Sequence, residues 1–423
     1  MGEILVRNFC EIFFYAGISF LIAIFVFPKF IRFVQKFKLT QKIRDRQISG
    51  GIAQIFRALH AHKAGTPVMG GAVIIFAVLT TVALSRIFSF FGIIDHSILN
   101  RGETYLPIIT LAAVGFLGAI DDFLNIDENL VKKFFSKKTK IYFFLFLIFS
   151  AAARFLALNF LENFFSPANF FAAKNFLNFF FALAIFLNLI GLILFFEKKN
   201  QKGLSARVKF LTLFFFAIAG AAWFSFKLGW SKIHIPAVGD ADIGLFYFPV
   251  FIFIFVGTAN SVNLTDGLDG LAGGLLAIAF SVFSVISYFY GLPILSVFCA
   301  TIVGALGAFL WFNVPPAKIY MGDTGSLALG ATLGVIAMLT NAVLILAVVG
   351  FIFIFETISV ILQLFWKKFF KKKLFAIAPI HHHFETRGWS ETQIVMRFWI
   401  LGAGVGIIGL IVGILGMGNG RGF

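Results

Sequence analysis

The side chains best suited to chemistry lie in a polar segment near the C-terminal end of an otherwise apolar chain. The segment reads APIHHHFETRGW and contains His381, His382, His383 and Glu385. Imidazole and carboxylate groups are rare among apolar helices, where they most often contact an ion, a phosphate or a proton. The alternative interpretation is a solvated loop, or a histidine tract that binds metal without a function.

A second segment, NSVNLTDGLDGLAGG, has polar side chains at three-residue intervals: Asn260, Asn263, Asp266 and Asp269. This spacing brings them to one face of a helix or into one tight turn. The glycines among them let a ligand approach the backbone, and the carboxylates can bind a metal or the hydrogen-bond donors of a nucleotide. A helix cap explains one aspartate, but it does not explain four polar residues.

Three further acids lie at the ends of apolar runs. Asp323, in MGDTGSLALG, begins one run, where an aspartate is a good helix cap. A carboxylate in this setting is also how proteins bind Mg²⁺, with one or two protein oxygens plus phosphate and water. Asp121 and Asp122 end another run, and neighbours on a helix point about 100° apart, so we expect them to have different roles. Asn125 stands where the DDxxD pattern of prenyl-diphosphate enzymes requires an acid.

The elements that position these residues are membrane spans. Hydrophobic residues make up 60% of the chain and charged residues 13%, with a mean hydropathy of +0.96, so the class is an integral membrane protein. A span needs about 20 apolar residues. We predict twelve, near 10–34, 68–90, 104–120, 141–160, 176–196, 207–229, 246–262, 271–290, 293–312, 325–340, 342–366 and 394–417. The first lacks a cleavage site and should remain as an anchor. Neither Cys10 nor Cys299 is given a function.

The net charge of +16 does not indicate a nucleic-acid partner, because the basic residues gather in alternate loops, as the positive-inside rule requires. With the N-terminus outside, the parity of twelve spans puts every polar cluster described above on the cytoplasmic side. Scattered loop residues would fall on both sides, so the shared face predicts an active site. A transporter is the alternative of another class, but transporters bind substrate near the midplane and show related halves, and no internal repeat is found.

Six segments together resemble one family. In chain order they are KAGTPVMGG, AIDD, KGLSARVK, NLTDGLDGLAGG, FLWFNVPPAKIYMGDTGSLALG and APIHHHFETRGW. The set is similar to that of the phospho-N-acetylmuramoyl-pentapeptide transferases and is spread over most of the chain. The acidic loops are shared with the wider superfamily of polyprenyl-phosphate sugar-1-phosphate transferases. A polyprenyl-phosphate N-acetylhexosamine-1-phosphate transferase is therefore the alternative enzyme.

The resemblance implies a Mg²⁺-dependent phosphoglycosyl transferase of peptidoglycan synthesis. Such an enzyme transfers phospho-MurNAc-pentapeptide from UDP-MurNAc-pentapeptide to undecaprenyl phosphate and forms lipid I and UMP. Its partners are these two substrates and membrane lipid. The sequence leaves the oligomeric state open, with a homodimer as one option. Its location is the bacterial inner membrane, with the active site on the cytoplasmic face.

The resemblance also assigns residues. It gives catalytic roles to Asp121, Asp122, Asp323, His381 and His382, with Asp323 holding Mg²⁺. It gives substrate-binding roles to Lys63, Thr66, Lys209, Asn260, Asn263, Asp266, Asp269, Asn313, Tyr320 and His383. The chain departs from the family pattern at Val68, where a threonine is usual, and at Tyr320, where a phenylalanine is usual.

The expected fold is an all-α polytopic membrane protein with a single catalytic domain over residues 1–423. Residues 127–197 lie between AIDD and KGLSARVK and make the segment between these motifs longer than in the family pattern. They contain two apolar runs. An insertion between two cytoplasmic motifs must cross the membrane an even number of times. We therefore predict a ten-helix core with an inserted two-helix transmembrane hairpin.

Overall fold

The computed structural model describes residues 2–37, 40, 63, 65–94, 97–100, 102–125 and 204–417. By their contacts, residues fall into two units. Met1–Asp122 and Leu213–Phe423 form the first, and Phe123–Thr212 form the second. The predicted hairpin at 127–197 lies outside the described residues and stays a prediction.

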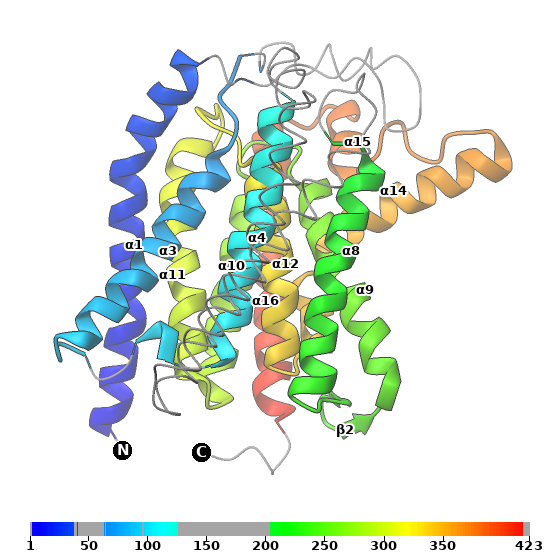
Figure 1. The fold of residues 1–423 in the computed structure, drawn as a ribbon. Helices are drawn as coiled ribbons and strands as arrows, with labels where there is room; N and C mark the ends of the chain where they lie inside the picture. The colour runs from blue at the N-terminus through cyan, green and yellow to red at the C-terminus, as the bar shows by residue number, and fades with distance from the viewer. Residues whose placement is uncertain are drawn as a thin grey trace, which may run out of the picture. The chain divides into compact units, whose positions relative to one another are not determined.

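The described chain is almost entirely helical, which confirms the all-α class (Figure 1). The long helices are α1 (Gly2–Lys36), α3 (Gly70–Phe90), α4 (Gly102–Leu124), α8 (Ala206–Ala222), α9 (Tyr247–Thr265), α10 (Leu271–Phe289), α11 (Pro293–Asn313), α12 (Gly322–Leu339), α14 (Phe351–Phe370) and α16 (Glu391–Leu415). Shorter helical elements are η2 (Ile98–Asn100), the π-helix η3 (Trp223–Lys227), η4 (Gly244–Phe246), α13 (Val343–Val349) and α15 (Ile380–Thr386).

Hydropathy predicted these spans well. Within the described residues, nine helices are long and apolar enough to cross a membrane, or ten if α13 and α14 count as one span. The predicted single span at 342–366 needs a correction, because α13 and α14 meet at Gly350 with a bend of 79°. A side chain at Gly350 would place its Cβ 2.8 Å from the Leu346 carbonyl oxygen, so the backbone would have to shift to accept one.

Small residues let the helices of the first unit approach closely, as is usual in membrane bundles. A Cβ at Gly304 of α11 would lie 2.0 Å from the Ala16 carbonyl oxygen of α1. A Cβ at Gly330 of α12 would lie 2.7 Å from the Thr258 carbonyl oxygen of α9. Helix α12 is buried over residues 324–339, so it forms the centre of the first unit.

A short hairpin precedes α9. Strands β1 (Lys232–Ile235) and β2 (Gly239–Asp242) pair antiparallel. His234 of β1 has Nδ1 2.7 Å from a carboxylate oxygen of Asp240 and Nε2 2.8 Å from the Gly416 carbonyl oxygen, after the end of α16. The imidazole thus connects the hairpin to the end of α16. Because α9 starts beside this hairpin and ends just before Asp266, the hairpin and the acidic turn lie at opposite ends of α9.

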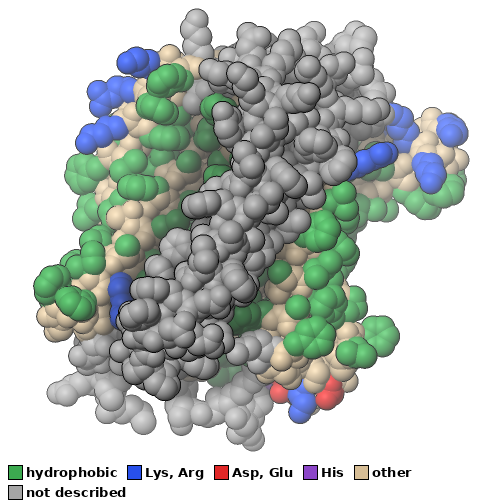
Figure 2. All heavy atoms as spheres, viewed as in Figure 1, with side chains coloured by type: hydrophobic (Ala, Val, Ile, Leu, Met, Phe, Trp, Pro, Cys, Tyr) green, Lys and Arg blue, Asp and Glu red, His purple; other side chains and the backbone are tan. Residues whose placement is uncertain are grey.

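Large apolar side chains are exposed along the outer helices, as expected for lipid-facing surfaces (Figure 2). On α1, Phe13 and Phe25 are 72% and 71% exposed. Five lysines gather around the end of α14: Lys367, Lys368, Lys371, Lys372 and Lys373. This arrangement fits the integral membrane class that the composition predicts.

Candidate active site

Three carboxylates from two helices meet at one end of the first unit. Asp121 and Asp122 lie in the last turn of α4, and Asp323 lies in the first turn of α12. One ligand oxygen from each lies within 4.8 Å of the others. The helices meet because Gly118 has no side chain, since a Cβ there would lie 2.3 Å from the Asp323 carbonyl oxygen.

Asp122 caps α12 from a different helix. Its Oδ1 accepts the backbone N–H of Asp323 at 3.0 Å, and its Oδ2 accepts the N–H of Thr324 at 3.0 Å and the hydroxyl of Thr324 at 2.6 Å. These N–H groups have no partner within α12 itself. Gly322 completes the cap, because it adopts a φ of 74° and a Cβ there would lie 2.4 Å from Asp122 Oδ2. Asp122 therefore holds the helix that carries Asp323.

Helix α9 contributes two more polar residues to the same place. Asn263 donates from Nδ2 to Asp323 Oδ1 at 2.8 Å and to the Ser326 hydroxyl at 2.9 Å. Asp266, just past the end of α9, accepts the backbone N–H of Gly322. Burial, and then the negative charge of Asp323, raise the pKa of Asp266 to about 7. The ends of α4 and α9 and the start of α12 thus bring these acids into one cluster.

The acidic cluster suits a metal ion. Asp121 and Asp122 are 1% and 6% exposed, and like charges buried this close repel strongly. A cation offsets that repulsion. All the ligand atoms are carboxylate oxygens, which favour a hard divalent ion such as Mg²⁺ over softer metals.

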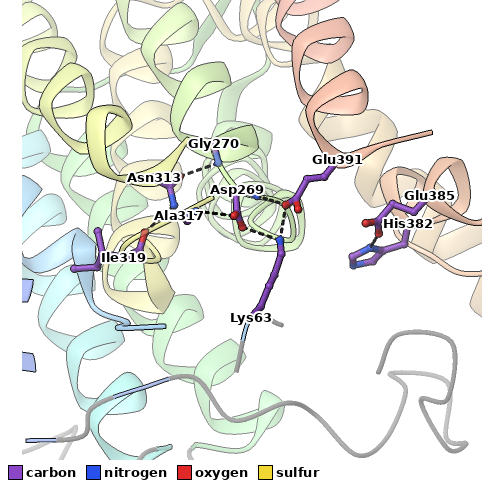
Figure 3. A network of polar contacts seen from close by, with 9 residues as sticks. All are labelled: Lys63, Asp269, Gly270, Asn313, Ala317, Ile319, His382, Glu385 and Glu391. Atoms are coloured by element: carbon purple, nitrogen blue, oxygen red, sulfur yellow. Dashed lines mark hydrogen bonds and ion pairs between the residues drawn. The ribbon is translucent and has the colours of Figure 1, made fainter. Parts of the chain in front are cut away.

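A second network surrounds Asp269, in the turn between α9 and α10 (Figure 3). Its Oδ1 lies 2.7 Å from Lys63 Nζ, and its Oδ2 accepts the Ala317 backbone N–H at 2.9 Å. Glu391, at the start of α16, accepts the Asp269 N–H at 2.7 Å and also pairs with Lys63. Burial alone lowers the pKa of Lys63, but the charges of Glu391 and Asp269 and their hydrogen bonds outweigh it, so the pKa is raised above its usual value.

Asn313 and Tyr320 extend this network. Asn313 accepts the Gly270 N–H at 2.9 Å and donates to the Ile319 carbonyl oxygen at 2.8 Å, which fixes the loop after α11 against the 266–270 turn. The Tyr320 side chain hydrogen-bonds to Thr66, and burial followed by the Asp269 charge raises its phenol pKa. Residues that are far apart in the sequence therefore form one surface beside Asp269.

The first two histidines of α15 face the same turn. A Cβ at Gly267 would lie 2.3 Å from His381 Nε2 and 3.4 Å from His382 Nε2. His382 Nδ1 lies 2.6 Å from Glu385 Oε2. His381 Nδ1 lies 3.0 Å from Glu356 Oε2 of α14. The turn that carries Asp266 and Asp269 is thus packed directly under two imidazole rings.

Known proteins identify the family. Proteins named phospho-N-acetylmuramoyl-pentapeptide-transferase match almost the whole chain. The Geobacillus thermodenitrificans protein is 33% identical over 397 residues, 94% of this chain and 96% of its own length. The proteins of Listeria welshimeri and Staphylococcus epidermidis are 33% and 32% identical, covering 94% and 95% of this chain and 95% and 99% of their own lengths. The chain belongs to the phospho-N-acetylmuramoyl-pentapeptide-transferase family. A model of glycosyl transferase family 4 also matches residues 179–341.

Family membership confirms the resemblance drawn from the motifs and makes the chain a phosphoglycosyl transferase of the membrane. Neither alternative, the N-acetylhexosamine-1-phosphate transferase or the transporter, is favoured by these relatives. The acidic cluster and the Asp269 network contain most of the residues that the family motifs assigned.

Three assigned residues have described contacts within their own segments. Asn260 donates to the Val256 carbonyl oxygen of its own helix at 2.8 Å. His383 accepts the Ala376 N–H at 3.2 Å and lies against the Phe375 ring. Lys209 belongs to the second unit, where its backbone N–H donates to the Ser205 carbonyl oxygen. Their assignments to the substrate site remain predictions.

Two site residues were not predicted from the sequence. Glu356 is the one acid in the apolar run FIFIFETISVILQLF, and an acid in such a run is a functional signal by itself. Glu391 follows Ser390, whose side chain forms a capping box with Gln393 at the start of α16. A glutamate in the first turn of a helix is common, so its contact with Lys63 gave no sequence signal.

Proposed function

We propose that this enzyme transfers phospho-MurNAc-pentapeptide from UDP-MurNAc-pentapeptide to undecaprenyl phosphate, at the cytoplasmic face of the bacterial inner membrane. The products are lipid I and UMP. The observation that carries this proposal is the meeting of Asp121, Asp122 and Asp323 at the ends of two membrane helices. A site at a helix end can receive a soluble nucleotide from water and a lipid phosphate from the bilayer.

In the proposed reaction, a phosphate oxygen of the lipid attacks the sugar-bearing phosphorus of the nucleotide. One P–O bond forms, the P–O bond to UMP breaks, and UMP leaves with the electron pair. A phosphate monoester is largely ionised near neutral pH, so the attacking oxygen needs little activation. The main barrier is repulsion between two anions, and the protein must reduce it.

The two neighbouring acids have separate tasks in this proposal. Both oxygens of Asp122 accept hydrogen bonds from Asp323 and Thr324, so Asp122 orients the start of α12. Asp121 then orients the lipid phosphate and accepts its remaining proton when one is present. Direct attack is preferred to a covalent aspartyl phosphate, because the acceptor is already a nucleophile.

Mg²⁺ is the proposed cofactor, with Asp323 as its principal ligand and Asp121 beside it. When bound, the ion neutralises charge on the diphosphate of the donor. Asn263, which donates to Asp323 Oδ1, fixes the direction of that carboxylate. Asp266 borders the same cluster, where it would face the ribose, the diphosphate or the metal.

The Asp269 network is the proposed uracil site. Lys63, Asp269 and Asn313 offer charged and amide groups that match the polar edge of a pyrimidine, and Tyr320 offers an aromatic ring for stacking. Thr66 bonds the Tyr320 side chain and so supports that ring. His381 and His382 lie beside the turn, where the sugar phosphate would be bound.

One assay tests the proposal. Purified enzyme should release UMP from UDP-MurNAc-pentapeptide only when undecaprenyl phosphate and Mg²⁺ are both present, and Asp323→Asn should serve as the inactive control. The same assay with UDP-N-acetylglucosamine should give little UMP. Preference for UDP-N-acetylglucosamine would favour the alternative enzyme, and no release from either donor would refute the proposal.

A further inference from the structure

Glu356 of α14 and His381 of α15 form a pair with no exposed side-chain surface. Their side chains are both 0% exposed, and Glu356 Oε2 lies 3.0 Å from His381 Nδ1. Glu356 lies five residues after the start of α14, beyond the bend at Gly350. The pair therefore lies between α14 and the histidine helix and connects a membrane segment to the site.

The hydrogen bond determines the tautomer of His381. A carboxylate oxygen accepts, so Nδ1 carries the proton in this contact. His381 Nε2 and Glu356 Oε1 are fully buried and have no hydrogen-bond partner among the described residues. The Nε2 atom faces Gly267, in the turn that carries Asp266 and Asp269. The ring thus has one nitrogen fixed by Glu356 and the other directed at the site.

A purely structural role does not account for this pair. Burying a carboxylate is costly, and an apolar residue of similar volume usually stabilises a protein at least as well. Here one carboxylate oxygen lacks a partner among the described atoms, so the pair is not optimised for stability. Its specific effect is to fix the ring plane and tautomer of one histidine, as carboxylates that hydrogen-bond to metal-bound and catalytic histidines do.

We propose that Glu356 is a positioning residue that holds His381 as the Nδ1–H tautomer, with Nε2 directed at the 266–270 turn. The role in turnover rests on the proposed function, whereas the tautomer itself does not. His382 supports the geometry, because its ring centroid lies 4.1 Å from that of His381 and its own Nδ1 is bound by Glu385. Glu356 thus acts on the reaction only through His381.

The first test is spectroscopic. Enzyme labelled with ¹⁵N-histidine is compared with Glu356→Leu and Glu356→Gln, and the His381 signal is assigned by its loss in His381→Ala. Wild type and Glu356→Gln should show protonated Nδ1, because the amide can turn its oxygen toward the ring. Glu356→Leu, which keeps the volume, should show protonated Nε2 or a mixture. Protonated Nε2 in wild type overturns the proposal, whatever the enzyme transfers.

The second test uses UMP release. Glu356→Leu should lower kcat by about 100-fold with KM for the nucleotide changed less than about threefold, and Glu356→Gln should stay within about fivefold of wild type. In a His381→Ala background, Glu356→Leu should cause no further loss, since it acts through that ring. Thr357→Val is the matched control, because it removes a hydrogen bond from α14 to Ser261 of α9 and should keep near-normal kcat.

The outcomes separate the two proposals. The role of Glu356 is overturned if wild type is active and Glu356→Leu is equally active. It is also overturned if Glu356→Leu lowers kcat by the same factor in wild type and in His381→Ala. A wild type that releases no UMP overturns the proposed function, and the tautomer measurement then still decides the role of Glu356.

Discussion

Asp122 accepts the backbone N–H of Asp323 at 3.0 Å, so one acid of the cluster caps the helix that carries another. This contact makes the neighbouring Asp121 and Asp122 unequal, although the sequence gives them the same residue type. A change at Asp122 should disturb the fold at the start of α12 as well as the chemistry.

Asp122→Asn is therefore expected to reduce stability. The asparagine amide has only one oxygen that can accept hydrogen bonds. It therefore cannot replace both carboxylate oxygens of Asp122, one of which accepts from Asp323 and the other from Thr324. The expected loss is about 1–3 kcal/mol, seen as a lower apparent Tm in detergent. Thr324→Val, which removes one of the three hydrogen bonds, should lower the Tm less. An unchanged Tm in Asp122→Asn would show that Asp122 is not a structural cap.

Asp323→Asn is expected to remove most activity while the protein stays folded. The amide keeps an oxygen near Asn263 but loses the charge that attracts a divalent ion. Mn²⁺ binding, followed by electron paramagnetic resonance, should weaken in parallel. Ser326→Ala removes a neighbouring hydrogen bond to Asn263 without changing charge, and it should lose less than about tenfold in activity. Normal turnover of a folded Asp323→Asn enzyme would contradict the assignment.

The pKa of Asp266, raised to about 7, predicts a pH-dependent stability. The usual aspartate pKa is about 3.9, so between about pH 4 and pH 7 the unfolded chain loses this proton while the folded chain keeps it. The folded state then binds more protons, and stability falls as pH rises through this window and levels off above it. Asp266→Asn should remove that component, measured as apparent Tm from pH 5 to pH 8. Parallel curves for wild type and variant would argue against a raised pKa.

Glu391→Gln is expected to weaken nucleotide binding. Lys63 is 10% exposed in its side chain and is held by both Glu391 and Asp269, so removal of one charge frees the lysine to move. KM for the UDP-linked donor should rise about tenfold, equal to about 1.4 kcal/mol, with kcat changed little. Gln393→Ala is the control, because it disturbs the capping box of the same helix without contacting Lys63. Equal effects of both variants would assign the loss to the helix start.

Sequence predicted the helices because lipid requires long apolar runs with internally satisfied backbone groups. It also predicted that Asp121, Asn263, Asp323 and His381 share one end of the bundle, since that follows from counting spans. It did not predict the bend at Gly350, because α13 and α14 are both apolar and hydropathy does not report direction.

The contacts within the site depend on tertiary packing. Which of two adjacent aspartates caps α12 is set by the close approach at Gly118, and this cannot be read from their spacing. Glu356 and His381 are 25 residues apart and meet only because α15 folds back onto α14. Glu391 has no motif around it that indicates Lys63. The residue types in the sequence therefore indicated which residues are functional, but only the fold showed which of them contact one another.

The final prediction concerns residues 127–197, which we expect to cross the membrane twice. Lysines before the first apolar run and after the second, including Lys132, Lys140 and Lys198, indicate that both ends are inside. The region at 161–175 should then face outward. In a chain with Cys10 and Cys299 replaced, a cysteine introduced by Ser166→Cys should react with a membrane-impermeant maleimide from outside the cell.

Two described positions calibrate that experiment. Val238→Cys, at the exposed turn between β1 and β2, should react from the same side as Ser166→Cys, because it lies at the opposite end of α9 from Asp266. Lys372→Cys, at the exposed end of α14, should react only from inside. Labelling of Ser166→Cys from inside alone would reject the two-crossing hairpin.

Replacing 127–197 by a short polar linker then tests whether the enzyme requires this segment. Retained UMP release would show that the insertion is dispensable. A stable variant that inserts into the membrane but is inactive would show that the segment belongs to the catalytic fold.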